Sequence, residues 1–330
     1  FYSICHVSNL INFEGKYCRP DILVPADCDA CLNKKYGIEA GSQQIRRSYW
    51  NNLFSDIDGL IFNTQGGFEL AAKIYSNVAN HPNIKILPVA IEPIEIPNVG
   101  KRSGDELRVA ILGNFILHKG ADVVLEAIDN LASENISFHF FGEIEDIYIE
   151  KINLSKNPKI YRYGKYPSGK LPIELFSCDI SLHVSICPET YGLSLSEAWA
   201  AGLIPIGSDI GALGERVIDG INGVKVEAGS SAELRKAILQ FTSDKNLAKR
   251  LSERIALLPN GWISDHAKQL ITYYKRILAQ LEGVQIHSTN LKPNFVKTSL
   301  VWASFTNPPQ KETSMMRKYL QKAKRLLLSS

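Results

Sequence analysis

The sequence predicts an α/β fold in which parallel strands are covered by helices, and three observations predict it. Residues 107–112 are a continuous apolar run, as expected of a central strand that is buried on both faces. Short apolar strands alternate with amphipathic helices, which is the pattern of parallel sheets. Around residues 178–207 a strand, a loop, a helix and a second strand follow one another. Open sheets of this kind bind ligands at the carboxyl ends of their strands, so this loop is the expected site.

The first part of the chain predicts only part of such a domain. Residues 1–40 are expected to be a cysteine-bearing loop, and residues 41–93 the remainder of the domain. Within this remainder we expect a helix at 41–54, a strand at 59–62, a helix at 68–78 and a strand at 84–87. The prolines at 88, 93 and 97 and the few periodic apolar residues around them then predict a linker at 94–104.

Residues 105–283 predict a second and complete domain. We expect strands at 107–112, 137–141, 159–163, 178–185, 203–207 and 224–226. We expect helices at 121–131, 171–178, 193–202, 232–243 and 264–281, with Gly202 in the left-handed position past a helix end. His139 and His183 lie in apolar runs and are expected to be core histidines with satisfied hydrogen bonds.

Two loops carry chemistry. Lys119 stands where the strand at 107–112 gives way to a helix, a place suited to neutralising a diphosphate. The loop from Gly113 to Gly120 is neither a P-loop nor the dinucleotide Gly-x-Gly-x-x-Gly. Glu189 and Glu197 frame the start of the helix at 193–202, whose N-terminus attracts anions. Glu197 has two open interpretations, a ligand group or a capping-box partner of Ser194.

The residues Pro188 to Pro205 resemble the donor-binding signature of the retaining glycosyltransferases of family four. The likeness rests on two glutamates at the right separation, a Tyr-Gly between them and a Glu-Ala-x-Ala-x-Gly-x-Pro continuation. The resemblance extends from about residue 105 to about residue 280, and more loosely back to Phe1. It implies two Rossmann-like domains of the B-type glycosyltransferase fold, of which the N-terminal, acceptor domain is incomplete here.

The resemblance also implies the site residues. Lys119 and Glu189 are expected to be catalytic, and the expected donor-binding residues are Gly113, His118, Tyr191, Gly192, Leu193, Ser194 and Glu197. The implied reaction is transfer of a sugar from a nucleotide diphospho-sugar to a glycan or lipid-linked acceptor, with the anomeric configuration retained. No cofactor is needed for that chemistry, because a lysine and helix dipoles take the place of a metal.

The sequence departs from the family pattern at two points. Asn114 stands where the family usually carries an arginine, and the family's upstream histidine is missing, since His6 does not occupy its position. The chain starts with Phe1, which suggests an N-terminal truncation. These departures keep an alternative open, a non-catalytic nucleotide-sugar-binding protein or inactive partner of a glycosyltransferase assembly.

Four cysteines crowd the start of the chain, namely Cys5, Cys18, Cys28 and Cys31. The spacing of the last two lets both thiolates reach one tetrahedral ion, and a structural zinc would organise a segment with little core of its own. Disulfides and unconnected thiols are the alternatives. Cys178 and Cys187 are expected to pack in the interior.

The last segment, residues 284–330, is a basic tail with eight Lys or Arg against one acidic residue. Residues 315–328 predict an amphipathic helix that suits contact with anionic lipid or a partner. Few basic residues and no interleaved aromatics argue against nucleic acid as a partner. We therefore expect a cytoplasmic enzyme of polysaccharide or cell-envelope synthesis that acts at the inner face of the membrane.

Overall fold

The computed structural model describes residues 1, 3–6, 8–97, 104–167, 169–257 and 263–281. The basic tail and its predicted amphipathic helix lie outside the described residues, as do residues 98–103 of the predicted linker. Within the described part, no helix combines the length and apolar character needed to cross a membrane.

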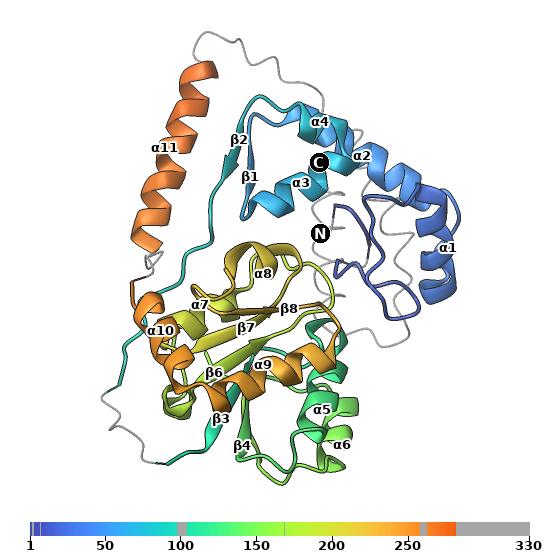
Figure 1. The fold of residues 1–330 in the computed structure, drawn as a ribbon. Coiled ribbons are helices and arrows are strands. Elements are labelled where there is room, and N and C mark those ends of the chain that lie inside the picture. The colour runs from blue at the N-terminus through green and yellow to red at the C-terminus, as the bar shows by residue number, and fades with distance from the viewer. Residues whose placement is uncertain (2, 7, 98–103, 168, 258–262, 282–330) are drawn as a thin grey trace, which may run out of the picture. The chain divides into compact units, whose positions relative to one another are not determined.

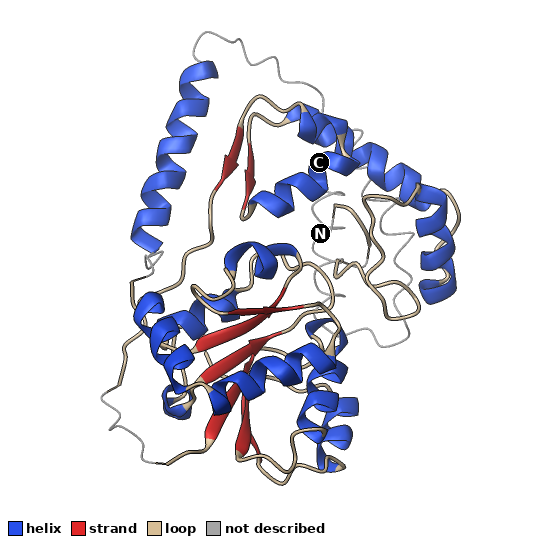
Figure 2. Cartoon of the chain, in the orientation of Figure 1, coloured by secondary structure: helices blue, strands red, loops and turns tan. Residues whose placement is uncertain are grey.

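A six-stranded parallel sheet carries the second half of the chain (Figures 1 and 2). In sequence order its strands are β3 (Leu107–Leu112), β4 (Ile136–Phe141), β5 (Ile160–Gly164), β6 (Ile180–His183), β7 (Ile204–Ser208) and β8 (Val224–Val226). Their order across the sheet is β5-β4-β3-β6-β7-β8. The predicted strands are confirmed to within two residues at most ends.

Both faces of β3 are apolar and must be shielded from water, and helices cover the sheet on both sides. Val109 and Ile111 face a core shared with α5 (Ala121–Asp129), α9 (Ser231–Ser243) and α10 (Lys245–Ile255). Ala110 and Leu112 face a second core shared with α7 (Leu193–Ala200) and the 3-10 helix η2 (Ile173–Ser177). Further helices are α6 (Asp146–Asn153), α8 (Gly211–Arg216) and the 3-10 turn η1 (Leu117–Lys119).

The first part of the chain has a smaller parallel sheet, β1 (Leu60–Phe62) beside β2 (Ile84–Ile86). Around it lie α1 (Pro25–Tyr36), α2 (Ser42–Asp56), α3 (Gln65–Ile74) and α4 (Ser76–Ala79). The last described helix, α11 (Ile263–Leu281), bonds to this sheet, since the Tyr273 hydroxyl contacts the carbonyl oxygens of Leu60 at 3.3 Å and Asn83 at 2.9 Å.

Three predicted elements need correction. The helix predicted at 68–78 is interrupted at Tyr75, which ends α3 and begins α4. The helix predicted at 171–178 is a five-residue 3-10 turn that starts after Pro172. The predicted cysteine loop contains α1, which has Pro25 in its first turn and Gly37 in the left-handed position past its end, as helix boundaries commonly do.

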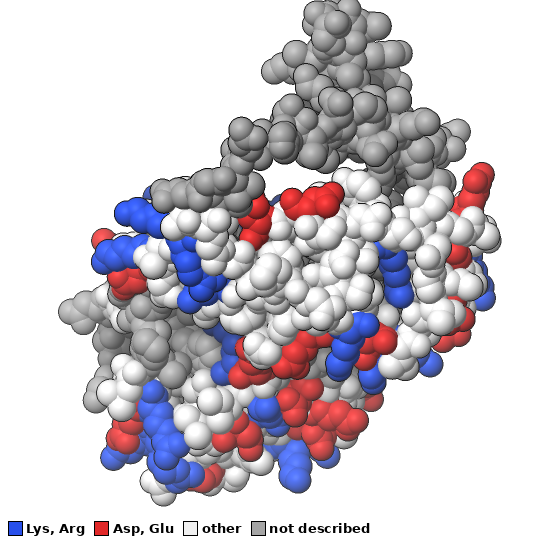
Figure 3. Space-filling view, turned by 90° about the horizontal axis from the view of Figure 1, so that it is seen from above, with Lys and Arg blue, Asp and Glu red and all other residues white. Residues whose placement is uncertain are grey.

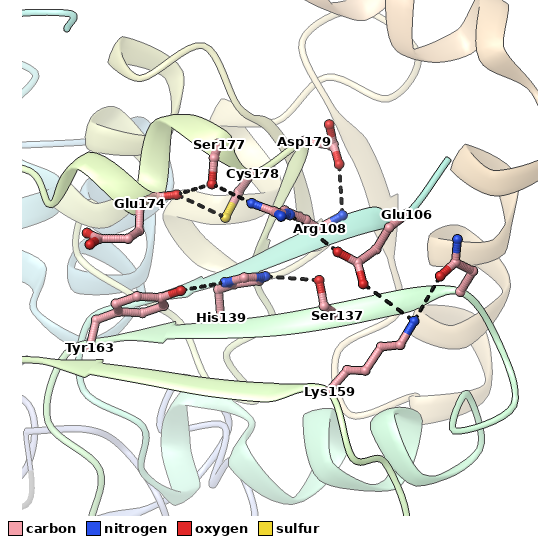
Figure 4. Close-up of polar contacts among 11 residues, drawn as sticks. Glu106, Arg108, Ser137, His139, Lys159, Tyr163, Glu174, Ser177, Cys178 and Asp179 are labelled. Atoms are coloured by element: carbon pink, nitrogen blue, oxygen red, sulfur yellow. Dashed lines mark hydrogen bonds and ion pairs between the residues drawn. The ribbon is translucent and has the colours of Figure 1, made fainter. Parts of the chain in front are cut away.

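A polar network lies at the amino-terminal ends of the strands, on the η2 side of the sheet (Figure 4). The Arg108 guanidinium donates to Ser177 Oγ at 3.0 Å, and the backbone N–H of Arg108 donates to Asp179 Oδ2 at 2.8 Å. His139 is 4% exposed and lies between Ser137 Oγ at 2.9 Å and the Tyr163 hydroxyl at 3.0 Å. The expectation that His139 is a satisfied core histidine is confirmed.

We expect Gly120→Ala to destabilise the fold severely. Gly120 has φ +84°, and a Cβ atom there would lie 2.1 Å from the carbonyl oxygen of Val184, so the backbone would have to move. The free energy of unfolding should fall by about 3 kcal/mol or more. Urea denaturation measures this.

Gly202→Ala is the matched control. Gly202 also has a left-handed φ, +80°, as predicted, but nothing lies within 4 Å of the position that a Cβ atom would take there. Its cost should be the backbone strain alone, about 1 kcal/mol. Equal losses in the two variants would contradict the close packing of the loop at Gly120.

Candidate active site

The site lies where the strand order of the large sheet reverses. From β3 the chain proceeds outward through β4 and β5, whereas β6, β7 and β8 lie on the other side of β3. The carboxyl ends of β3 and β6 are neighbours, because Ile111 pairs with Leu182 in parallel register. Ligands of open α/β sheets bind at such a switch point. The loops that follow these two strands therefore form one site.

The loop after β3 places a lysine opposite the start of α7. It turns at Gly113, where φ is +89°, and a Cβ atom there would lie 4.0 Å from Ser194 Cβ. The backbone N–H of Gly113 donates to Phe141 O at 2.8 Å, so this glycine offers space for a ligand and not a free amide. The turn η1 then presents Lys119, whose side chain is 34% exposed.

The N-terminus of α7 is open to an anion. Its N-cap residue is Gly192, with φ +81°, and no side chain caps the helix. The capping-box interpretation is wrong, because Ser194 Oγ lies 3.4 Å from His183 Nδ1 and Glu197 accepts a hydrogen bond from the Tyr166 hydroxyl at 2.7 Å. The first amides of the helix, at Leu193 and Ser194, are thus left for a ligand.

An ion pair joins the two loops. Lys119 Nζ lies 2.8 Å from Glu189 Oε2, and Ser185 donates from its hydroxyl to Glu189 Oε1. Burial alone would raise the pKa of the Glu189 carboxyl, but the Lys119 ammonium and the Ser185 hydroxyl outweigh it and hold that pKa below its ordinary value. Glu189 is therefore a carboxylate at neutral pH, and this pair is lost only as pH falls through that lowered pKa.

Arg216, which sequence reasoning missed, holds the loop before α7. Its guanidinium donates to the carbonyl oxygens of Tyr191 at 2.8 Å and Gly192 at 2.9 Å and to Ser196 Oγ at 2.7 Å. It also lies 3.8 Å from the centroid of the Tyr191 ring. Tyr191 is thus turned toward Arg216. The available signal was position, since Arg216 directly follows the glycine-rich segment 208–215, which begins at the carboxyl end of β7.

His183 is a core histidine that also reaches the site. It is 5% exposed, its Nε2 lies 3.0 Å from Ser181 Oγ, and its Nδ1 faces Ser194. Burial lowers the pKa of the His183 imidazole to about 3, and Lys119 and Arg216 favour the neutral ring as well. A neutral imidazole can orient the Ser194 hydroxyl in the first turn of α7 without adding charge to the site.

The two remaining predicted donor-binding residues, His118 and Glu197, have pKa values shifted in opposite directions. The backbone carbonyl of His118 accepts from Ile186 N at 3.1 Å, which ties the two loops together, and burial followed by Lys119 lowers the pKa of its imidazole. Glu197 lies one turn into α7, and burial raises the pKa of its carboxyl although the hydrogen bond from Tyr166 opposes the shift. Tyr166 was not predicted from the sequence.

The four N-terminal cysteines come near one another without forming a metal cage. Burial, and then Cys5, Cys28 and Cys31, raise the pKa of Cys18 to about 12, and Arg47 donates to Cys28 Sγ at 3.6 Å. Cys18, Cys28, Cys31 and Cys187 are free thiols. Among the described residues, no three His, Cys, Asp or Glu side chains are arranged to hold a metal ion. Zinc at these cysteines stays a prediction. Cys178 and Cys187 are buried, as expected of packing residues.

Comparison with known proteins bears on the fold and on the class of protein. Residues 94–257 match the family model of glycosyl transferases group 1. The chain is 27% identical over 286 residues to the glycogen synthase of Thermodesulfovibrio yellowstonii, across 83% of this chain and 56% of that protein. It spans about half the length of the curated relatives it matches.

Solved structures with the same fold include the sucrose-phosphate synthase of Thermosynechococcus elongatus, with a TM-score of 0.61, 18% identity and coverage of 73% of this chain and 65% of that one. They also include Anabaena Alr3699/HepE in complex with UDP, with a TM-score of 0.57, 16% identity and coverage of 74% and 69%. At such identities the likeness establishes the fold alone. The predicted fold class is confirmed: the chain has the Rossmann-like, B-type glycosyltransferase fold, and its residues 94–257 match the group 1 glycosyl transferases.

Proposed function

We propose that this chain is a retaining glycosyltransferase of family four that uses a nucleotide diphospho-sugar. One observation carries the proposal: the Lys119–Glu189 pair lies in the two loops of the switch point, with the uncapped N-terminus of α7 beside it. Cation, helix end and carboxylate are the groups that a diphosphate and a sugar need. The group 1 match and the glycogen synthase relative support the same reaction class.

The charges suggest how the residues act. An acceptor hydroxyl oxygen forms a bond to the anomeric carbon, the bond from that carbon to the phosphate oxygen breaks, and its electron pair stays on the nucleoside diphosphate. The acceptor proton leaves with that phosphate oxygen or passes to solvent. Lys119 and the α7 amides stabilise the negative charge that develops on the diphosphate, while Glu189 accepts hydrogen bonds from sugar hydroxyls. No step needs a divalent metal.

The acceptor in this proposal is a glycan or a lipid-linked glycan of a polysaccharide or cell-envelope pathway in the cytoplasm. Membrane contact through the basic tail lies outside the described residues and stays a prediction. Nucleic acid is not proposed as a partner. On the face seen in Figure 3, Lys and Arg side chains are interspersed with Asp and Glu and form no extended basic patch.

A binding protein without transferase activity is the second candidate. Asn114, which stands at the arginine position of the family, favours it, because one phosphate-neutralising charge is missing. Calorimetric binding of a panel of nucleotide diphospho-sugars, set beside transfer and donor hydrolysis on the same samples, tests both. Binding with turnover supports the transferase. Binding without either reaction supports the second candidate, and no binding at all would contradict both.

Glu197→Gln should leave the protein as stable as wild type or more stable, and should weaken donor binding. Burial raises the pKa of Glu197, so ionising it costs stability as pH rises above the ordinary carboxyl pKa. Gln still accepts the Tyr166 hydrogen bond, so the melting temperature at pH 7 should be equal or higher. We expect Glu197 to accept a hydrogen bond from the ribose of the donor, and the variant loses the charge of that acceptor. Affinity for the donor should therefore fall about tenfold, roughly the worth of one charged hydrogen bond.

Thermal unfolding at pH 4 and pH 7 and calorimetry check this pair of effects. The stability advantage of the variant should vanish at pH 4, where the wild-type carboxyl is protonated and therefore as neutral as the glutamine. A less stable variant that binds the donor as tightly as wild type would show that Glu197 is structural.

A further inference from the structure

A cavity of about 520 Å³ lies beside Glu189, and its walls come from two parts of the compact unit Phe1–Gln280. One wall is formed by the segment with Tyr17, Arg19 and Asp21 and by the start of α3. The other is formed by the loop at Pro188 and Glu189 and by the start of α8. Its volume is that of a site for a small ligand. In the proposed reaction, the second substrate must reach the donor sugar from a space next to Glu189.

The charges of this cavity disfavour an anion. Four acidic and two basic side chains line it, which gives the wall a formal net charge of −2; they are Arg19, Asp21, Glu69, Lys73, Glu189 and Glu215. One of the two cations is already paired, since the Arg19 guanidinium holds Asp21 through two contacts of 3.1 and 3.0 Å. Glu189 is likewise paired, with Lys119, so the charges left after pairing are those of Glu69, Glu215 and Lys73. A phosphate or carboxylate that entered would meet these two carboxylates with one lysine to offset them.

The helix end in this cavity is also filled. Glu215 accepts hydrogen bonds from the backbone N–H groups of Gln65 at 3.0 Å and Gly66 at 2.8 Å, at the first turn of α3. The N-terminus of a helix is the usual place for a bound phosphate, and here a carboxylate of the same chain occupies it. Among the described side chains of the cavity wall, Lys73 is therefore the remaining cation that could bind an anion.

The groups that remain suit hydroxyls. Tyr17 is half-buried in the wall, and its hydroxyl has no hydrogen-bond partner among the described residues. Burial, and then Asp21 and Cys18, raise the pKa of Tyr17 to about 12, so the hydroxyl keeps its proton at neutral pH. An isolated antiparallel bridge pairs Ile11 with Tyr17. A Cβ atom added at Gly15 would lie 3.5 Å from Leu117 Cδ2, so this turn lies close to the loop that carries Lys119. Tyr17 thus offers a neutral donor and acceptor to a ligand.

We propose that this cavity binds a neutral, hydroxyl-rich sugar as the acceptor, with the Tyr17 hydroxyl and the Glu69 carboxylate among its contacts. The inference rests on the proposed transferase function and narrows it. The part of the acceptor that enters the site is an uncharged glycan end, and neither a sugar phosphate nor an acidic sugar.

The experiment compares acceptors that differ only in charge. Neutral methyl glycosides and short oligosaccharides are offered beside the same sugars carrying a phosphate or a carboxylate, with the full chain and a donor that calorimetry shows to bind. We expect kcat/KM for the neutral acceptors to be at least tenfold higher. A preference for the phosphorylated or acidic sugars overturns the inference while leaving the transferase proposal intact. If no donor binds or is hydrolysed, the result would instead contradict the proposed function.

Two variants test the named contacts. Tyr17→Phe should raise the KM for the neutral acceptor about three- to tenfold without changing the Kd of the donor. Tyr36→Phe is its control, because Tyr36 is an exposed residue at the end of α1. Glu69→Lys should shift the ratio of phosphorylated to neutral acceptor use upward by about tenfold, with the exposed Glu39→Lys as its control. Unchanged acceptor kinetics in both test variants would remove these residues from the acceptor site.

Discussion

Lys119→Ala should lower transfer at saturating donor by about 100- to 1000-fold, the usual effect of removing one group that stabilises a developing oxyanion. The Kd of the donor should rise less than about tenfold. The difference arises because the ground-state diphosphate still binds the first amides of α7, whereas the charge that builds up during bond cleavage loses its nearest cation. Steady-state kinetics with donor calorimetry measures both quantities.

Lys151→Ala is the matched control, since Lys151 also pairs with a carboxylate, Asp122, on the exposed surface of α6. It should leave both quantities unchanged. A Lys119→Ala variant that binds donor poorly but turns over normally at saturation would contradict the assignment, because the lysine would then serve binding alone.

Glu189→Gln should move transfer and product binding in opposite directions. Gln retains an oxygen for the Ser185 hydroxyl, but the ion pair with Lys119 is lost. Lys119 no longer divides its charge between a carboxylate and the diphosphate, so the nucleoside diphosphate should bind about two- to fivefold more tightly, the worth of a partly exposed ion pair. Transfer should fall about 100-fold, because the side chain at position 189, which accepts hydrogen bonds from the sugar hydroxyls, has lost its charge.

The exposed Glu143→Gln, which breaks the pair with Lys165, is the control for Glu189→Gln. It should change neither quantity. Weaker binding of the diphosphate to Glu189→Gln, together with normal transfer, would show that Glu189 only supports the loop.

The local patterns of the sequence predicted most of the large sheet and the centre of the site. A fully apolar β3 and the strand, loop and helix around Glu189 are short-range signals, and a parallel sheet brings the ends of its strands together without further information. Lys119 and Glu189 were therefore predicted from separate loops, and the structure places their charged atoms 2.8 Å apart.

The missed features depend on contacts between distant segments. Arg216 and Tyr166 are ordinary residues in the sequence, and only packing shows that one holds the loop at Gly192 and the other bonds to Glu197. The capping-box pattern at Ser194 failed for the same reason, since Gly192 is the N-cap residue of α7 and the side chains of Ser194 and Glu197 have tertiary partners. A short motif records which residues are present and not which partner each one finds.

A crystal structure of this chain with a nucleotide diphospho-sugar tests the central claim most directly. Our account predicts a phosphate oxygen within about 3 Å of Lys119 Nζ, another at the amides of Leu193 or Ser194, and sugar hydroxyls on the Glu189 carboxylate. A diphosphate bound away from the start of α7, or a Glu189 carboxylate that contacts no part of the sugar, would contradict it.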